Sequence, residues 1–237
     1  MIPYRAIRSN IEFAAKVLPQ MNNTSRVVSM LPTAHMYGLM FEVLYEMSRG
    51  AHVFFLSRLP SPKIIMQALA EVKPTLVIAV PLIIEKIYKS KVKPVLEKAG
   101  IRFVMKLPGL EQVVMNKIKT ELINAFGGEF VEVIIGGAAF NKEVESFFKK
   151  MEFPFTVGYG MTECAPIITY DGHKTAKLYS CGRIVPNMEM KIDSPDPQNI
   201  PGELLVRGAN VFLGYYKNEE ATKEVLEDDG WFHTGDM

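Results

Sequence analysis

Residues 131–163 read VEVIIGGAAFNKEVESFFKKMEFPFTVGYGMTE, and they contain two short apolar runs separated by an amphipathic segment. The runs, 131–135 and 153–157, have the length and the β-branched and aromatic content of buried strands. Asn141 is a good N-cap for a helix between them. The apolar positions of that helix fall at helical spacing: Val144, Phe147, Phe148 and Met151. A strand, a helix and a second strand in this order predict a parallel β-α-β unit.

The same alternation continues toward the N-terminus. The spacing of apolar residues, and prolines at first helical positions, predict helices over 4–18, 38–47, 62–71, 82–89 and 113–126. Short apolar runs predict strands over 26–31, 51–56 and 75–80. We therefore expect an α/β fold, in which residues 1–175 form a doubly wound, mostly parallel sheet with helices on both faces.

The sequence changes in character after Pro166. Met188, Met190 and Ile192 alternate with charged residues, which predicts a half-buried antiparallel strand, and residues 202–207 predict another. Residues 176–237 are therefore expected to form a small β-rich subdomain that follows the α/β body.

The overall composition of the chain limits which partners it is expected to bind and where in the cell it is expected to be. With 27 Lys and Arg residues against 26 Asp and Glu residues the net charge is +1, so no nucleic-acid partner is expected. The two cysteines, Cys164 and Cys181, are too few for a disulfide framework, which favours the reducing cytoplasm. No apolar run reaches the roughly 18 residues of a membrane span. We expect no transmembrane segment, and peripheral membrane contact remains open.

The most informative segment for function is Gly158-Tyr159-Gly160-Met161-Thr162-Glu163, which follows a predicted strand. Its glycines allow the backbone to turn sharply and to approach a ligand closely. The ring of Tyr159 can offer a flat face to a base, the hydroxyl of Thr162 can donate to a phosphate oxygen, and the carboxylate of Glu163 can hold Mg²⁺. A glycine-rich turn with an exposed tyrosine would give the same pattern.

Three other segments could contribute to the same site. Gly136-Gly137-Ala138 ends a predicted parallel strand, where ligands bind in open α/β sheets, although tight strand-to-helix packing explains the small residues as well. His35 follows the 26–31 strand and is either a site residue or a hydrogen-bonded structural histidine. Asp236, in Thr234-Gly235-Asp236, can accept hydrogen bonds from a ribose diol or close an Asx turn.

Several common motifs do not occur. The sequence has no G-x-G-x-x-G fingerprint, which argues against an α/β oxidoreductase, and no Gly-Lys pair, which excludes a P-loop. The histidines and cysteines show no spacing typical of a zinc site.

Taken in order, these segments resemble the adenylate-forming superfamily of acyl-CoA synthetases, luciferases and peptide-synthetase adenylation domains. Residues 31–38 are similar to its L-P-x-x-H-x-x-G segment and residues 136–138 to its G-G-A segment. Residues 159–163 resemble its Y-G-x-T-E signature. Residues 202–216 resemble G-E-L-x-x-R-G followed by G-Y, and residues 230–236 resemble G-W-F-x-T-G-D. The resemblance covers essentially the whole chain.

The resemblance implies roles for these residues. Tyr159 would stack on adenine, Asp236 would hold the ribose hydroxyls, and Thr162 would hydrogen-bond a phosphate. Glu163 would help to bind Mg²⁺, and His35 would lie near the acyl carboxylate, so that Thr162, Glu163 and His35 form the catalytic set. The implied nucleotide-binding residues are Gly136, Gly137, Ala138, Gly158, Tyr159, Gly160, Met161, Thr162 and Asp236.

The resemblance also implies a two-step reaction and its substrates. A carboxylic acid would react with ATP, with Mg²⁺ as cofactor, to give an acyl-adenylate, and coenzyme A would then displace AMP. The family's phosphate loop normally precedes the helix at 4–18 and a small C-terminal domain normally follows Met237. We therefore expect a partial N-terminal domain with little or no ligase activity alone. An apolar edge left exposed in such a piece could drive homodimerisation.

The acid is harder to identify. No Asp occurs in residues 37–42, where peptide-synthetase domains usually hold an amino group, so an amino acid is disfavoured. Met36, Leu39, Met40 and Phe41 suit an apolar chain or simply belong to the core. Overall resemblance favours a long-chain fatty acid. An aryl or other carboxylic acid, or a truncated non-catalytic nucleotide-binding module, are the alternatives.

Overall fold

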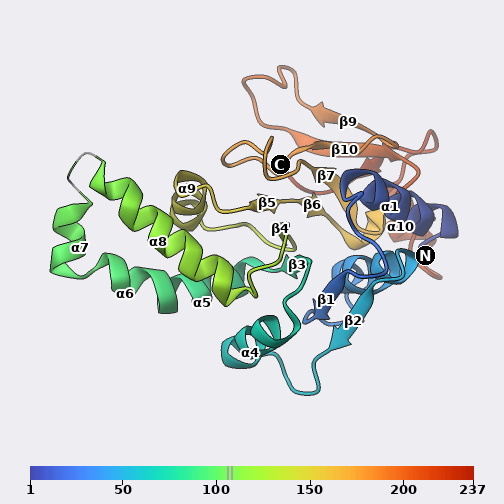
Figure 1. Cartoon of the computed structure of the whole chain (residues 1–237). Coiled ribbons are helices and arrows are strands. Elements are labelled where there is room, and N and C mark those ends of the chain that lie inside the picture. Colours follow the sequence, from blue (N-terminus) through green and yellow to red (C-terminus); the bar gives the residue numbers. More distant parts are fainter. Residues whose placement is uncertain (106, 108) are drawn as a thin grey trace.

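Parallel strands lie at the centre of the computed structural model, which describes residues 1–105, 107 and 109–237 (Figure 1). Strand β1 pairs with β2, and β4 lies between β3 and β5, all in parallel. These strands are β1 Arg26–Ser29, β2 His52–Phe55, β3 Leu76–Ala79, β4 Glu132–Ile135 and β5 Phe155–Val157. The amide of Thr75 donates to the carbonyl oxygen of Arg26 at 2.7 Å, which joins the beginnings of β3 and β1. The predicted α/β fold with parallel strands is confirmed.

Helices cover both faces of the parallel strands. The first part of the chain forms α1 Tyr4–Val17, α2 Met36–Gly38, the π-helical segment η1 Leu39–Leu44, α3 Tyr45–Ser48, α4 Pro62–Val72, α5 Pro81–Ile87 and the π-helical η2 Tyr88–Val92. The remainder forms α6 Lys93–Leu96, α7 Ala99–Val104, α8 Leu110–Ala125, α9 Lys142–Lys150, the 3₁₀ turn η3 Thr162–Cys164 and α10 Glu219–Val225. Within the described residues, no helix combines the length and apolar content that crossing a bilayer requires.

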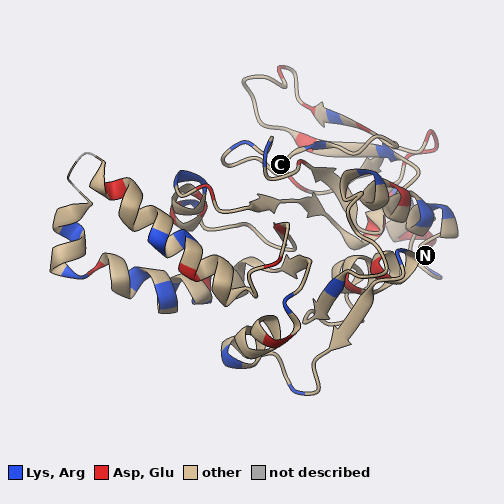
Figure 2. Cartoon of the chain, in the orientation of Figure 1, with Lys and Arg blue, Asp and Glu red and all other residues tan. Residues whose placement is uncertain are grey.

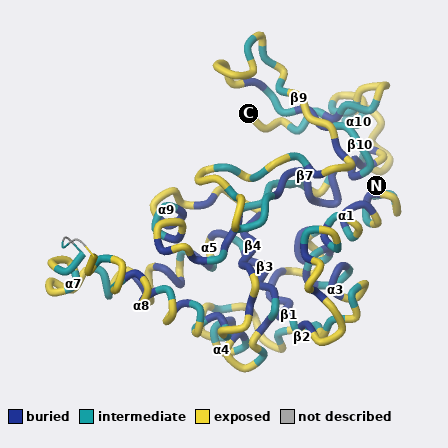
Figure 3. The backbone as a smooth tube through the Cα atoms, turned by 45° about the horizontal axis from the view of Figure 1, so that its top comes forward, coloured by how far each residue is buried: buried dark blue, intermediate teal, exposed yellow. Residues whose placement is uncertain are grey.

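Alternate residues of the strands belong to two separate hydrophobic cores, because successive side chains of a strand point to opposite faces of the sheet. Val77 and Val133 belong to the core that α4, α5, α8 and α9 cover. Ile78 and Ile134, one position along, belong to the core that α1 and the 36–48 helices cover. Strands β3 and β4 are buried on both sides between these layers, as the dark segments of Figure 3 show, whereas β2 is largely exposed.

The last third of the chain adds two antiparallel sheets. The predicted strands at 188–192 and 202–207 are confirmed as β9 Met188–Asp193 and β10 Glu203–Gly208, and β10 also pairs with β11 Phe232–His233. A second sheet, β6 Tyr159–Gly160, β7 Ile167–Tyr170 and β8 Arg183–Ile184, was not predicted. Because β7 and β8 pair across the expected boundary at 175, the division into body and subdomain stays a prediction.

Two other departures concern helices. The helix predicted at 38–47 is confirmed, but it begins at Met36 and contains the π-helical segment η1. The helix predicted at 82–89 continues through η2 into α6. Local pattern predicted no element for α7 or α10, which are short and bury no residue completely.

A buried carboxamide ties α1 to the segment that follows β6. Asn10 is fully buried, and its Nδ2 donates to the carbonyl oxygens of Ala6 at 2.8 Å and Cys164 at 3.3 Å. Its Oδ1 accepts from the amide of Ile167 at 3.1 Å. Since buried polar groups are costly to leave unpaired, this one side chain fixes α1 against η3 and β7.

We expect Asn10→Ala to lower the free energy of unfolding by about 1–3 kcal/mol, because it leaves the Cys164 carbonyl and the Ile167 amide unpaired in the core. Urea denaturation followed by circular dichroism measures the change. The exposed Asn116→Ala on α8 is the matched control and should shift the free energy by less than about 0.5 kcal/mol. Equal losses in the two variants would contradict this role for Asn10.

Candidate functional site

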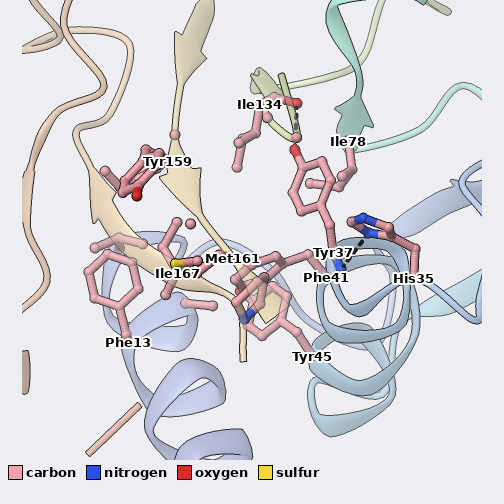
Figure 4. Close-up of a pocket in the computed structure, with 18 of the residues that line it drawn as sticks. Phe13, His35, Tyr37, Phe41, Tyr45, Ile78, Ile134, Tyr159, Met161 and Ile167 are labelled. Atoms are coloured by element: carbon pink, nitrogen blue, oxygen red, sulfur yellow. Dashed lines mark hydrogen bonds between the residues drawn. The ribbon is translucent and has the colours of Figure 1, made fainter. Parts of the chain in front are cut away.

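Two cavities meet at the carboxyl ends of β4 and β5. The first, of about 290 Å³, lies between α1, the 36–48 helices and the strand ends (Figure 4). The second, of about 560 Å³, lies beside residues 137–140 and extends to Asp236. Both cavities are lined by Gly137, Gly158, Tyr159 and Gly160, so they adjoin at the predicted glycine segments.

The lining of the cavities depends on the lack of side chains at two glycines, Gly160 in the wall that both share and Gly136 in the first. A Cβ on Gly160 would lie 2.0 Å from the carbonyl oxygen of Pro166, which no relaxation of a flexible side chain can relieve. A Cβ on Gly136 would lie 3.1 Å from Cζ of Tyr37. The hydroxyl of Tyr37 donates to the carbonyl oxygen of Ile134 at 3.1 Å, which holds its ring over Gly136. The small residues therefore serve close packing as well as lining the cavities.

Tyr159 and Asp236, which are 77 positions apart, are brought into direct contact. The Tyr159 hydroxyl donates to Oδ2 of Asp236 at 2.5 Å. Burial, and then this hydrogen bond to a carboxylate, raise the pKa of Tyr159 well above its ordinary value. The phenol therefore keeps its proton and acts as a donor.

Strand β10 positions the segment that carries Asp236. The amide of Gly235 donates to Oε1 of Glu203 at 2.9 Å, and the hydroxyl of Thr234 donates to the carbonyl oxygen of Leu204 at 2.7 Å. Asp236 itself remains exposed at the rim of the second cavity.

Thr162 and Glu163 begin the η3 turn and line the first cavity. Tyr215, which sequence analysis did not single out, donates its hydroxyl to Oε1 of Glu163 at 3.0 Å. The carbonyl oxygen of Glu163 accepts from the amide of Phe212 at 2.8 Å, so both ends of the residue are held. No group of three or more His, Cys, Asp or Glu side chains able to hold a metal occurs in the described part of the chain. A divalent cation would therefore have to take most of its ligands from a bound phosphate and water, which is how Mg²⁺ is commonly held.

His35 lines the first cavity near the N-terminus of α2. Its Nδ1 accepts from the amide of Tyr37 at 3.2 Å and caps that helix. With Nδ1 used as an acceptor, the proton of the neutral ring is on Nε2, which can donate to a ligand in the cavity. Both interpretations of His35 offered by the sequence, a structural hydrogen bond and a position at the site, are therefore compatible with the geometry.

The remaining predicted residues divide between the two cavities. Met161 lines the first, Ala138 the second, and Gly136 the first. Cys164, next to Glu163, is buried, and burial raises the pKa of its thiol to about 12. The thiol stays protonated and is unsuited to act as a nucleophile.

Glu42 is a second residue that sequence analysis missed. It is buried on η1, and its carboxylate accepts from the hydroxyl of Ser29 at 3.2 Å and from the amides of Met30 at 3.2 Å and Leu31 at 3.0 Å. These bonds hold the backbone that leads from β1 to His35. Burial raises the pKa of Glu42 to about 7, although the three hydrogen bonds oppose the shift. A charged residue within an apolar helix was the available signal.

Glu46 lies one helical turn beyond Glu42 and is also fully buried. Neither of its carboxylate oxygens has a hydrogen-bond partner among the described residues. Burial raises its pKa to about 8, with Glu42 adding to the shift and Arg49 opposing it. The carboxyl group is therefore protonated at neutral pH.

Comparisons with known proteins place these features in a family. Residues 1–216 match the family described as AMP-binding enzyme, and the chain belongs to that family. It is 30% identical over 270 residues to "Long chain acyl-CoA synthetase 4" of Arabidopsis thaliana, covering all of this chain and 39% of that protein. It is 29% identical over 236 residues to "Long-chain-fatty-acid--CoA ligase ACSBG2" of Homo sapiens, covering 89% of this chain and 35% of that protein. The chain thus spans less than half the length of these relatives.

Solved structures agree on the fold. Apo MatB from Rhodopseudomonas palustris superposes with a TM-score of 0.74 at 20% identity, over 99% of this chain and 41% of that chain. O-succinylbenzoate coenzyme A synthetase from Bacillus subtilis, in complex with AMP, superposes with a TM-score of 0.73 at 19% identity, over 99% and 42%. The predicted resemblance to adenylate-forming enzymes is confirmed at the level of family and fold.

We expect Glu46→Met to stabilise the chain most at high pH. The folded-state pKa of Glu46, about 8, exceeds its ordinary value of 4.5, so the folded chain binds a proton that the unfolded chain releases. The free energy of unfolding therefore falls as the pH rises from about 4.5 to about 8. An apolar side chain of similar length removes this loss and should add roughly 1–3 kcal/mol above pH 8.

Urea denaturation of both proteins across this pH range measures the effect. The exposed Glu121→Met on α8 is the control and should leave the pH dependence unchanged. An identical pH dependence in native protein and Glu46→Met would show that Glu46 does not titrate as its burial requires.

Proposed function

We propose that this chain forms part of an ATP-dependent ligase that activates a long-chain fatty acid as its acyl-adenylate and transfers it to coenzyme A. The observation that carries the proposal is the junction of the two cavities at residues 158–160. An apolar acid chain in the first cavity and a nucleotide in the second would bring a carboxylate and an α-phosphate together at these glycines. Membership of the AMP-binding family and similarity to long-chain acyl-CoA synthetases support it.

The nucleotide would be recognised by Tyr159 and Asp236. The flat ring of Tyr159 would stack on adenine, and the carboxylate of Asp236 would accept hydrogen bonds from the ribose hydroxyls. Because these two side chains bond to each other in the structure, binding would loosen or replace that bond with contacts to the ligand. Gly137, Ala138 and the neighbouring glycines would leave space for the base.

The reaction would take place at the cavity junction. A carboxylate oxygen of the acid attacks the α-phosphorus, and the bond to pyrophosphate breaks. The thiol sulfur of coenzyme A then attacks the acyl carbon, and AMP leaves. Thr162 would donate a hydrogen bond to a phosphate oxygen, and the Nε2 proton of His35 would orient the acid carboxylate.

Glu163 would hold Mg²⁺ through its carboxylate, which Tyr215 fixes in place. When bound, the cation would neutralise charge on the phosphate oxygens. One protein carboxylate with phosphate and water ligands suits Mg²⁺, which rarely relies on an all-protein site.

The acid itself is inferred from the first cavity, whose wall is mainly aliphatic and aromatic. Its apolar lining includes Phe13, Ala14, Val17, Leu18, Phe41, Leu76, Ile78, Ile134, Met161 and Ile167. The alkyl chain of a fatty acid would be buried favourably against such an apolar surface. An aryl acid is the second candidate, because "4-coumarate--CoA ligase 5" of Oryza sativa is similar to this chain at 28% identity over 225 residues.

Two expectations about the protein's setting are also proposals. Cys164 and Cys181 are both free, which supports a cytoplasmic location. A homodimer is supported by β2, a strand whose Phe54 and Phe55 are exposed. An unpaired apolar edge of this kind is suited to self-association.

We expect Tyr159→Ala and Asp236→Ala each to weaken AMP binding by roughly tenfold to a hundredfold, because each removes about 1–3 kcal/mol of stacking or charged hydrogen bonding. Isothermal titration of this chain with AMP measures the affinities. Tyr4→Ala and Asp228→Ala, which alter exposed residues outside both cavities, should bind as the native chain does. Unchanged affinity in the two site variants would place the nucleotide elsewhere.

The acyl cavity gives an independent prediction. Val17→Phe adds volume on α1 where it lines the first cavity, so it should weaken binding of a non-hydrolysable palmitoyl-AMP analogue by about tenfold or more while leaving AMP affinity unchanged. The exposed Val113→Phe is the control. Tighter binding of a coumaroyl-AMP analogue than of the palmitoyl analogue by the native chain would favour the aryl acid.

A further inference from the structure

An arm of helices projects from the α/β body on the side away from the chain termini. It comprises residues 86–119, from the end of α5 through η2, α6 and α7 into α8 (Figure 1). Helix α6 continues directly from η2, and α7 contacts both α6 and α8. Its outer end, at α7, lies far from α1 and β7 in Figures 1 and 3.

The outer half of the arm exposes large apolar side chains, although Val95, Leu96 and Val114 pack against the core of the body. From Lys93 to Val114 none of the described residues is buried. Phe103 is 66% exposed, Leu110 45% and Val113 64%. Large apolar side chains gathered at the end of a projection mark a surface that another apolar phase covers.

The arm is also strongly basic, although the chain as a whole is nearly neutral. Residues 86–119 contain nine Lys or Arg and two Glu, out of 27 basic and 26 acidic residues in the whole sequence. Figure 2 shows the basic residues along η2, α6 and α7. Six of them make no ion pair within the described part of the chain: Lys86, Lys89, Lys91, Lys98, Arg102 and Lys117.

We propose that this arm docks on the surface of an anionic lipid bilayer. Phe103, Leu110 and Val113 enter the interface between headgroups and acyl chains, where apolar side chains leave water. Arg102 lies on the same short helix as Phe103, and Lys98 is the N-cap of that helix. Both cations lie at the level of the anionic headgroups. The combination of unpaired cations with exposed apolar residues fits a lipid surface in both respects.

Other partners fit only one of these features. A second copy of the chain would cover the apolar residues, but it would bring two basic arms together. A nucleic acid would neutralise the charge, but it would leave Phe103, Leu110 and Val113 in water. The bilayer is therefore the occupant that the arm's chemistry selects.

Sedimentation with vesicles tests the proposal on the intact chain. We expect binding to vesicles of equimolar phosphatidylglycerol and phosphatidylcholine that weakens as salt is added, and little binding to phosphatidylcholine alone. Lys98→Gln combined with Arg102→Gln removes two charges near the surface and should weaken binding by roughly 30-fold. Phe103→Ser should weaken it by about tenfold.

Matched variants elsewhere on the surface serve as controls. Lys16→Gln combined with Lys223→Gln removes the same charge outside the arm, and Leu59→Ser replaces an apolar residue that is 88% exposed. Both should bind vesicles as the native chain does, and all variants should keep the native circular dichroism spectrum. Absence of vesicle binding by the folded chain, or equal losses in arm and control variants, would overturn the proposal.

Two further outcomes would assign the arm to another occupant and would also overturn it. One is a dimer in sedimentation velocity that Phe103→Ser dissociates. The other is duplex DNA binding at least as tight as vesicle binding and insensitive to Phe103→Ser.

Discussion

The side-chain amides of two asparagines hold Ile167, and the rest of the site depends on this constraint. Asn10 of α1 accepts from the Ile167 amide at 3.1 Å, and Asn210 donates to the Ile167 carbonyl oxygen at 2.7 Å. Both asparagines are fully buried, so these bonds are protected from water. They fix the turn that carries Thr162 and Glu163 between a helix from the beginning of the chain and a segment near its end.

The two cavities form where other segments pack around the position that these asparagines fix. Helix α1 is held across the strand ends, where it supplies one wall of the first cavity. The 36–48 helices supply the opposite wall, and Glu42 pins them to the end of β1 through three hydrogen bonds. The second cavity closes when the C-terminal segment meets Tyr159 through Asp236. Four segments that are distant in the sequence thus form one site. A few hydrogen bonds hold them together, and each of these bonds is buried or involves a charged group.

The elements predicted from sequence are those whose signal is local. Parallel strands such as 76–79 are continuous apolar runs, and helices such as α9 carry both a cap and a regular apolar face. The sheet of β6, β7 and β8 was missed because Ile167–Tyr170 is buried along its whole length, and its pairing depends on partners elsewhere in the chain. The glycine segments of the site could be predicted because their backbone conformation and close packing require glycine, which is visible in the sequence itself. The roles of Tyr37 and Tyr215 could not be predicted, because their partners lie 97 and 52 positions away, and only the charge of Glu42 within an apolar helix pointed to that residue.

The separation of the two cavity walls has an evolutionary consequence. The shared wall contains Gly160, where a Cβ would lie 2.0 Å from the carbonyl oxygen of Pro166, and Gly137, whose φ of +85° is rarely adopted by other residues, so these two positions tolerate little variation. The outer wall of the first cavity consists of ordinary helix residues, such as Phe13 and Val17, that can be exchanged for larger or smaller ones. Substitutions on α1 can therefore change which ligand the first cavity accepts, while the geometry at the junction of the two cavities stays the same.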